Sequence, residues 1–112
     1  MVGLIIYRQP GDVPIFFERH SAFKNAIYVA EVVVHNKWAS RGIGTSLLNE
    51  VAFIAQTLSV EQLLVDRHEQ NAASAGMMNK AGFIEIDCFL DPERRNAGSR
   101  KTCILSLALA TV

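Results

Sequence analysis

Apolar positions along the chain follow two periods, one typical of β-strands and the other typical of α-helices. Six short segments with turn-type borders are rich in β-branched and aromatic side chains, and we expect a strand in each. They are residues 2–7, 13–19, 26–35, 62–66, 83–90 and 102–110. Because Pro14 cannot donate a backbone hydrogen bond, we expect the second strand to begin late or to lie at a sheet edge.

Two longer segments place their apolar residues at helical spacing. Between residues 42 and 58 apolar side chains recur every three to four positions, and polar side chains fall on the opposite face. The Ala- and Met-rich segment 71–80 is also expected to be a helix, which Gly82 ends. The strand–helix–strand unit around residues 42–58 implies a locally parallel strand pair. We therefore predict an α/β (α+β) fold with helices packed on a mixed, mostly antiparallel central sheet, in a single domain over residues 1–112.

Composition and charge exclude several classes of function. The 112 residues carry 11 Lys and Arg against 11 acidic residues, so the formal net charge is zero. This balance argues against a nucleic-acid partner. The apolar stretches are too short to span a bilayer, and the N-terminus lacks the pattern of a secretory leader. We expect a cytoplasmic protein with no membrane partner.

Cysteine and histidine positions predict no metal site. Cys88 and Cys103 lack metal-type spacing, and we expect reduced thiols, with a single disulfide as the alternative. His20 and His68 have no partner at metal-ligand spacing and are expected at the surface.

A glycine pair marks the junction between the apolar strand 26–35 and the following helix. Gly42 and Gly44 would let a backbone rich in free N–H groups approach a bulky anion, since a helix N-terminus favours negative charge. Arg41 would add positive charge. The alternative is a tight turn without a ligand. The dinucleotide fingerprint does not match, because its third glycine is absent.

Two segments give the chain a specific resemblance. Residues 39–44, ASRGIG, are similar to R/Q-x-x-G-x-G/A, the acyl-CoA signature of the GNAT superfamily of N-acyltransferases. Residues 71–83, NAASAGMMNKAGF, are similar to the second family segment, N-x-x-A-x-x-L-Y-x-K-x-G-F, at the expected distance. The resemblance covers residues 2 to about 109.

The resemblance implies a binding site for acetyl-CoA (coenzyme A) and a place for each part of it. The pyrophosphate would lie on the backbone N–H groups of Arg41, Gly42, Ile43, Gly44 and Thr45. The pantetheine arm would add to the strand at Val32, Val33 and Val34, and the second segment would contribute Asn71 and Ser74. The thioester would lie where two central parallel strands splay apart.

Three departures from the family pattern shift this interpretation. Ala39 stands where the signature has Arg or Gln, so Arg41 or Lys37 would have to compensate. Met78 replaces the tyrosine that usually protonates the departing thiolate. The chain begins at what resembles the family's second strand, and the first strand and first two helices have no counterpart. A second subunit could supply the missing acceptor wall, so we expect a homodimer; the alternative is that the sequence is part of a longer chain.

Candidate catalytic residues lie in and beside the strand 26–35. Glu31 is its one charged residue; as a base its pKa would be raised by burial, and the alternative is a solvent-facing or ion-paired carboxylate. Tyr28 lies three residues earlier, so without a bulge only one of the two faces the cleft; its alternative is a core aromatic. His35 could relay protons or be an exposed loop residue, and Cys88 could act as the acid or be a structural thiol.

These expectations favour an acetyl-CoA-dependent N-acetyltransferase that acts on a primary amine of a small molecule or peptide. The amine would attack the thioester directly. The polar loop 91–100 could orient the acceptor. The alternatives are a catalytically weak acyl-CoA-binding module with a regulatory or assembly role, and a structural domain whose glycine turn holds nothing.

Overall fold

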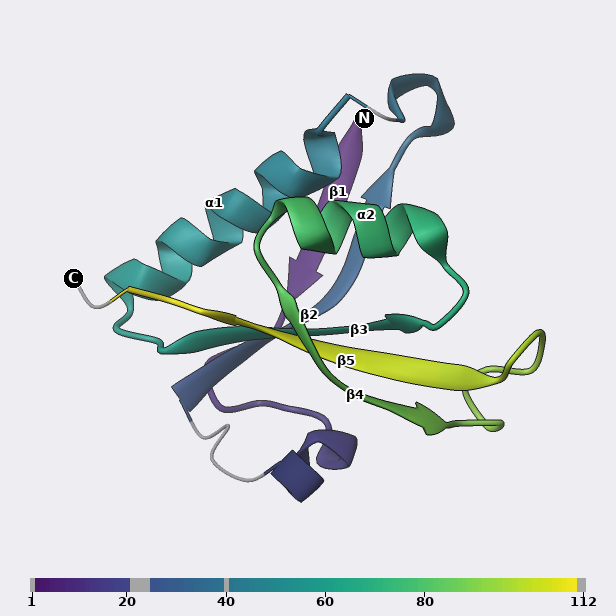
Figure 1. Ribbon diagram of the computed structural model, residues 1–112. Helices are drawn as coiled ribbons and strands as arrows, with labels where there is room; N and C mark the ends of the chain where they lie inside the picture. The colour runs from purple at the N-terminus through teal and green to yellow at the C-terminus, as the bar shows by residue number, and fades with distance from the viewer. Residues whose placement is uncertain (1, 21–24, 40, 111–112) are drawn as a thin grey trace.

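The computed structural model describes residues 2–20, 25–39 and 41–110 (Figure 1). The sheet in this part of the chain has five strands in the order β1-β2-β3-β5-β4. The strands are β1 (Gly3–Tyr7), β2 (Ala26–Val34), β3 (Gln62–His68), β4 (Ile84–Leu90) and β5 (Lys101–Ala108), and the helices are α1 (Ile43–Thr57) and α2 (Ala72–Lys80). Strand β2 pairs parallel with β3 across the α1 crossover, while the other pairs are antiparallel. The predicted mixed sheet with packed helices is confirmed.

The strand predicted at residues 13–19 is wrong. This segment forms the 3-10 helix η1 (Ile15–His20), so two strands rather than three precede α1 in the described residues. The carbonyl of Pro14 accepts a hydrogen bond from the N–H of Phe17, which closes the first turn. Phe17 is 1% exposed because it fills a hydrophobic cluster against the sheet. Burial of one aromatic ring therefore decides the local structure here, over the strand propensity of the sequence.

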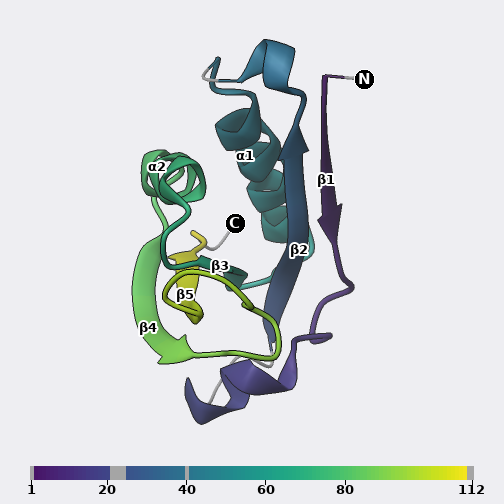
Figure 2. The same cartoon turned by 90° about the vertical axis from the view of Figure 1, so that its right-hand side faces the viewer.

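The two faces of the sheet carry separate hydrophobic clusters. Helices α1 and α2 lie on one face, and η1 lies near the other (Figures 1 and 2). The helix-side cluster includes Ile27, Leu48 and Leu63, and the η1-side cluster includes Phe17 and Leu64. Residues therefore sort to the two faces by the alternation of each strand.

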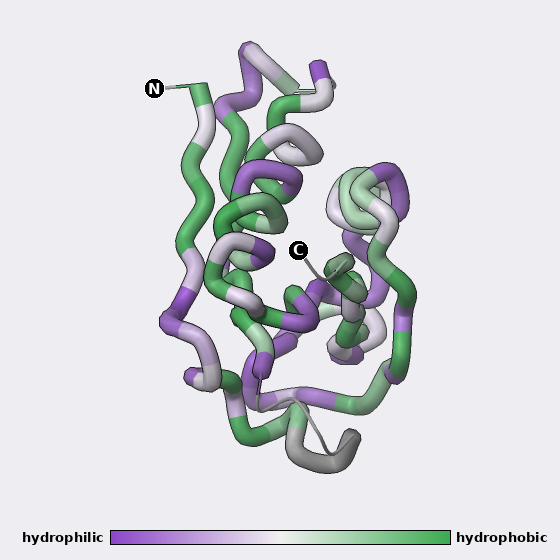
Figure 3. Tube along the Cα trace, turned by 90° about the vertical axis from the view of Figure 1, so that its left-hand side faces the viewer, coloured by the Kyte–Doolittle hydropathy of each residue, from purple (hydrophilic) through white to green (hydrophobic). Residues whose placement is uncertain are grey.

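Strand β2 matches its predicted burial over half of its length. Residues 26–29 are buried, as an apolar run at a sheet centre should be, whereas residues 30–34 are exposed or half-buried. At the outer edge, β1 presents Leu4 and Ile6, which are 42% and 43% exposed. Figure 3 shows this apolar character along β1.

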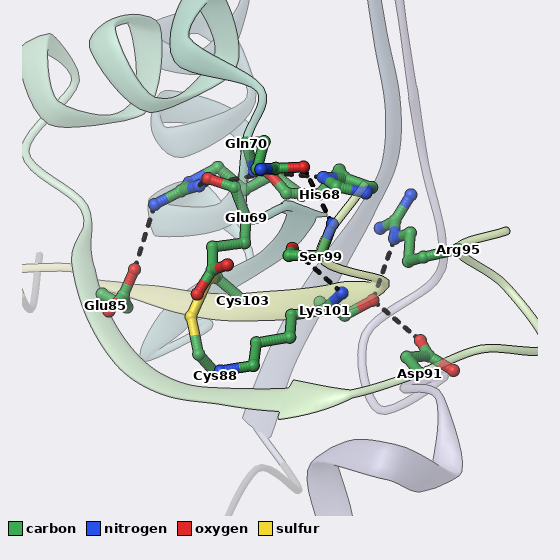
Figure 4. Close-up of a disulfide and its surroundings, with 12 residues drawn as sticks. His68, Glu69, Gln70, Glu85, Cys88, Asp91, Arg95, Ser99, Lys101 and Cys103 are labelled. Carbon is green, nitrogen blue, oxygen red and sulfur yellow. Dashed lines mark hydrogen bonds and ion pairs between the residues drawn. A yellow bond between two sulfur atoms is a disulfide. The ribbon is translucent and has the colours of Figure 1, made fainter. Parts of the chain in front are cut away.

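Cys88 and Cys103 form a disulfide, so the prediction of reduced thiols is wrong and its alternative holds. The two residues lie directly opposite each other in the β4–β5 pairing, which brings them together although they are 15 positions apart. Figure 4 shows the bond joining the two strands. The sequence spacing could not reveal this, because the register depends on the whole hairpin.

In the described part of the chain, we find no helix with the length and apolar character that crossing a membrane requires.

Candidate functional site

The parallel strands β2 and β3 separate part of the way along their length. They pair at Ala26–Gln62, Ile27–Leu63 and Tyr28–Leu64, and the pairing ends there. A pocket of about 370 Å³, here called the strand-gap pocket, lies beyond that point. Its walls are residues 29–32 of β2, residues 65–68 of β3, part of α2, and Arg94 and Arg95. The sequence-based expectation of a gap between two central parallel strands therefore has a counterpart in the structure.

A β-bulge on β2 changes which side chains face this gap. Ile6 pairs with Glu31, but Tyr7 pairs with Val29, which leaves Ala30 as the extra residue. A bulge reverses the alternation that follows it, so Glu31 lies on the same face of the sheet as Tyr28. Glu31 lines the strand-gap pocket and is exposed. This exposure matches the solvent-facing alternative for Glu31 rather than the buried base.

One edge of β2 has no strand beside it after the bulge. Val32, Val33 and Val34 pair with β1 on one side, while the described part of β3 pairs no further than Tyr28. The backbone groups that face β3 in this stretch are thus left without a strand partner among the described residues. A free sheet edge of this kind accepts an extended ligand as an added strand.

The glycine turn begins α1 with an unusual backbone conformation. Gly42 is the N-cap, with φ at +75°, and no side chain of the described residues caps the helix. A Cβ at Gly42 would meet nothing within 4 Å, whereas Gly44 is buried against Met77 of α2. The first N–H groups of α1 are therefore uncapped by side chains, and the turn leaves the space in front of Gly42 open.

A second pocket, the glycine-turn pocket, opens at this helix N-terminus. Its volume is about 310 Å³, and its walls include Gly42, Ile43, Gly44 and Thr45 on one side and Ala72, Ala73, Gly76 and Lys80 of α2 on the other. Met77 lines both this pocket and the strand-gap pocket, so the two adjoin. Lys80 contributes a cation that the motif comparison left without a role. The guanidinium of Arg41 stacks on Trp38, with 4.8 Å between Cζ and the ring centroid.

The start of α2 lies beside the strand-gap pocket. Asn71 is the N-cap of α2, and its Oδ1 accepts a hydrogen bond of 3.0 Å from the N–H of Ser74. Both residues line the strand-gap pocket. Asn71 therefore has a structural role as a cap, and its amide NH₂ group has no partner among the described residues, so it can face a ligand.

A buried carboxylate organises another part of the pocket wall. The side chain of Asp66 is 6% exposed, and its Oδ2 accepts 2.8 Å hydrogen bonds from Nη2 of both Arg94 and Arg95. The hydroxyl of Tyr28 donates to Oδ1 of the same carboxylate. We call this group of residues, from β2, β3 and the loop 91–100, the Asp66 cluster.

Thr102 connects the Asp66 cluster to the base of the loop. Its Oγ1 accepts from Nε of Arg95 at 2.9 Å and donates to Oδ2 of Asp91 at 2.7 Å. Figure 4 shows Arg95 and Asp91 joined in this way at the turn end of the β4–β5 hairpin. Sequence reasoning did not find the cluster, since its members come from distant segments. The signal available in the sequence was the adjacent pair Arg94 and Arg95, together with Asp66 at the end of the predicted strand 62–66.

Electrostatics within the Asp66 cluster hold Tyr28 in its neutral form. Burial raises the pKa of Tyr28 from its ordinary value of 10.0, and the charge of Asp66 and the hydrogen bond to it raise it further. Burial lowers the pKa of Arg94, but the charge of Asp66, the hydrogen bond to it and the charges of Tyr28 and Asp91 together outweigh burial, so the net shift is upward. Tyr28 is 5% exposed, packs in the η1-side cluster and does not line the strand-gap pocket. These features match the alternative of a core aromatic.

The structure places the other candidate residues as follows. Nδ1 of the exposed His35 accepts from the N–H of Lys37 at 3.1 Å. His68 lines the strand-gap pocket; its Nδ1 accepts from the N–H of Gln70, so its Nε2 donates to the carbonyl of Ala97. Cys88 has no thiol proton to give, because it is in the disulfide. Ser40 and the side chain of His20 lie outside the described part of the chain.

Comparison with solved structures identifies the fold. The ribosomal-protein-S18-alanine N-acetyltransferase from Escherichia coli matches 100% of this chain and 64% of its own, with a TM-score of 0.74 at 17% identity. The IAA acetyltransferase from Bacillus cereus matches 96% of this chain and 70% of its own, with a TM-score of 0.76 at 14% identity. A Bacillus subtilis acetyltransferase in complex with CoA matches 77% and 62%, with a TM-score of 0.68 at 16% identity.

The chain thus spans between 62% and 70% of the length of these three structures. A search of curated protein sequences finds no match. The model of the acetyltransferase (GNAT) family, by contrast, matches residues 1–83, which include the strand gap, the glycine turn and α2. On this match and on the geometry of both pockets, the chain belongs to the GNAT acetyltransferase family.

Proposed function

We propose that this protein is an acetyl-CoA-dependent N-acetyltransferase that acts on a primary amine of a small molecule or peptide. One observation carries the proposal: the uncapped start of α1 at Gly42 opens into a pocket that adjoins the gap between β2 and β3. A long ligand with an anionic end and an extended arm fits these two features together. Acetyl-CoA has this shape and supplies the acetyl thioester.

The chain's own residues fit the anionic end of the ligand. The backbone N–H groups from Arg41 to Thr45 would receive the pyrophosphate, since the helix dipole and uncapped donors favour an anion there. A side chain at Gly42 would project into this open space, which supports the cradle over an empty turn. Lys80, which lines the same pocket, offers a compensating cation for the missing Arg or Gln at Ala39.

The extended arm of the ligand would add to the free edge of β2. Val32, Val33 and Val34 would bind it through backbone hydrogen bonds, since this edge has no strand partner among the described residues. Asn71 and Ser74 line the strand-gap pocket and would contact the arm near its reactive end. This order leads from the helix N-terminus along β2 towards Glu31.

Glu31 is our candidate for the general base. It lies on the pocket wall and has no hydrogen-bond or ion-pair partner among the described residues, so it is free to receive a proton from the acceptor ammonium, directly or through water. In the transfer, a C–N bond forms to the acetyl carbon and the C–S bond breaks. Glu31 takes one proton from the ammonium before the attack, and the second N–H proton leaves through water, which delivers a proton to the departing thiolate. Tyr28 would position Asp66 rather than touch the substrates.

The alternative is a catalytically weak acyl-CoA-binding module with a regulatory or assembly role. Met78 favours it, because this residue is 5% exposed, packs in the helix-side cluster and carries no proton to donate to the leaving group. Both proposals share the same cofactor site. They differ in whether a bound amine is turned over.

The acceptor, the location and the assembly state stay predictions. One of the similar structures is an N-acetyltransferase of a ribosomal-protein alanine, which supports a peptide amine as one acceptor class. A homodimer would cover the exposed Leu4 and Ile6 on β1 and add a wall to the acceptor side. A cytoplasmic location agrees with the proposed use of acetyl-CoA, although the disulfide removes the argument that rested on reduced thiols.

Two measurements test the proposed function in sequence. Coenzyme A should raise the melting temperature of the protein, since a ligand that binds the native state stabilises it. The absence of a shift at millimolar coenzyme A would contradict both the enzyme and the binding module. Release of free thiol from acetyl-CoA over a panel of amines then separates the two. Glu31→Gln should reduce turnover about 10²-fold or more while keeping coenzyme A affinity. Glu61→Gln, at an exposed residue outside both pockets, is the matched control.

A further inference from the structure

The strand-gap pocket holds groups of both charges at different places on its wall. Glu31 lies on β2, while Arg94 and Arg95 come from the loop 91–100. A pocket of about 370 Å³ is large enough for a small acceptor that reaches both walls. The chemistry of these walls bears on which amines can occupy the site.

Each of the two arginines makes two side-chain hydrogen bonds with the described residues, but through different nitrogens. Arg94 donates through both Nη groups, to Asp66 at 2.8 Å and to Asp91 at 3.4 Å, and stacks on Phe16 with its Cζ 4.6 Å from the ring centroid. Its contacts with these three residues fix the position of the guanidinium. Arg94 therefore fixes the loop rather than offering itself to a ligand.

Arg95 keeps a free donor group. Its Nε donates to Thr102 at 2.9 Å and its Nη2 donates to Asp66 at 2.8 Å, but its Nη1 has no partner among the described residues. The side chain is 21% exposed and lines the strand-gap pocket. Two of its nitrogens are thus anchored, and the third is available with its orientation already set.

The availability of Nη1, rather than net charge, is what points to an anion. Asp66 and Asp91 together balance the two arginines in charge. However, a guanidinium held by two bonds and still carrying free N–H groups binds a carboxylate oxygen strongly, since such bonds are charge-assisted and little entropy remains to be lost. Glu31, unpaired among the described residues, offers the opposite charge to an ammonium.

We propose that the acceptor is an amine that also carries a carboxylate, with the ammonium directed to Glu31 and the carboxylate bound by Nη1 of Arg95. This inference rests on the proposed function for the transfer step and adds the class of acceptor to it. Free amino acids have this chemistry. The N-terminal residue of a peptide has it too when that residue is Asp or Glu.

The test compares each acceptor with its neutral partner. Thiol release from acetyl-CoA is measured for free L-amino acids and for the matching amino-acid carboxamides, with peptide amides that begin with Asp or Asn as a separate arm. The amine of a carboxamide is the less basic one, so without carboxylate recognition the carboxamide reacts better. We expect kcat/KM to be about 10-fold or more higher for the carboxylate form, the scale of a charged hydrogen bond. The set of substrates that shows the preference, free amino acids or peptides, identifies the source of the carboxylate.

Variants of Arg95 assign the preference to this residue. Arg95→Gln should abolish it mainly through a higher KM, and Arg95→Lys should keep part of it because the charge is retained. Arg100→Gln is the matched control: it removes the same charge from the same loop, at an exposed residue that lines neither pocket. Should Arg95→Gln fail to fold, the ratio of kcat/KM for the carboxylate and carboxamide forms in wild type and in Arg95→Lys still decides whether Arg95 recognises the carboxylate.

A binding experiment keeps the inference separate from the proposed function. N-acetylated amino acids, as products, should bind more tightly than their carboxamides by calorimetry, and Arg95→Gln should lose this difference while keeping coenzyme A binding. Turnover or binding that is equal for the two forms would overturn the inference and leave the acetyltransferase intact. Failure of coenzyme A to bind would instead overturn the proposed function, and the product-binding ratio would still decide the role of Arg95.

Discussion

Met77 of α2 packs against Gly44 of α1, and its sulfur lies where a Cβ on Gly44 would be. The other glycine of the turn, Gly42, has open space in front of it and a left-handed backbone with φ at +75°. The two glycines therefore have different roles. Gly44 allows two helices to approach, and Gly42 begins α1 without a side chain in the cradle.

Substitution of Gly44 by Ala should destabilise the protein through Met77. The added methyl group overpacks the contact between the helices, and we expect a loss of about 1–3 kcal/mol in the free energy of unfolding. Urea denaturation of Gly44→Ala, Met77→Ala and the double variant measures the coupling between the two sites. The second substitution should recover part of the loss.

Gly42→Ala is the matched control for this cycle. It should cost about 1 kcal/mol through backbone conformation and show no coupling to Met77, since no atom lies within 4 Å of its Cβ position. Additive effects of Gly44→Ala and Met77→Ala would show that the helices adjust freely, contrary to this account.

Local patterns in the sequence predicted the fold well where packing agrees with propensity. The alternation of strands and the helical period of residues 43–57 gave the correct elements and the parallel pair. Segment 13–19 was mispredicted because burial of Phe17 outweighed the strand propensity of its neighbours. The residues proposed to bind the cofactor could be named from the sequence because the motif is local, and their role stays a prediction.

Relationships between distant residues were beyond the reach of the sequence. Asp66 meets Tyr28 and the two arginines only after three segments pack together. The bulge at Ala30 depends on pairing with β1, and it decides that Glu31 and Tyr28 share a face. The disulfide depends in the same way on the β4–β5 register. In each case the deciding information is the register of strands rather than any local pattern.

Reduction of the Cys88–Cys103 disulfide should weaken the fold. The bond closes a loop of 15 residues that carries Arg94 and Arg95, and loss of such a cross-link costs about 3 kcal/mol through the entropy of the unfolded chain. Urea unfolding with and without a dithiol reductant measures this difference. The double variant Cys88→Ala/Cys103→Ala should not respond to the reductant. Equal stability of the reduced and oxidised wild type would contradict a cross-linked hairpin.

Tyr28 should make the protein sensitive to alkaline pH. Burial and Asp66 raise the pKa of Tyr28 in the folded state above its ordinary value of 10.0. The unfolded chain therefore releases this proton first. The stabilising contribution is complete below pH 10 and is lost as the pH rises towards the folded-state value.

Unfolding free energies between about pH 9 and about pH 11 check this contribution. Wild type should lose stability across this range more steeply than Tyr28→Phe. Tyr7→Phe, at a tyrosine that is 40% exposed, should keep the steep loss and serves as the control. Parallel profiles for wild type and Tyr28→Phe would contradict the raised pKa of Tyr28 that burial and Asp66 produce in the folded protein.

The central claim is that coenzyme A binds between the glycine turn and the free edge of β2. Titration of the ¹⁵N-labelled protein with coenzyme A, followed by amide chemical shifts, tests it most directly. We predict saturable shifts that are largest at the N–H groups of Ile43, Gly44 and Thr45 and extend to Val32–Val34, with little change on β4. Shifts that do not saturate at millimolar coenzyme A, or that leave the start of α1 unchanged, would contradict the account.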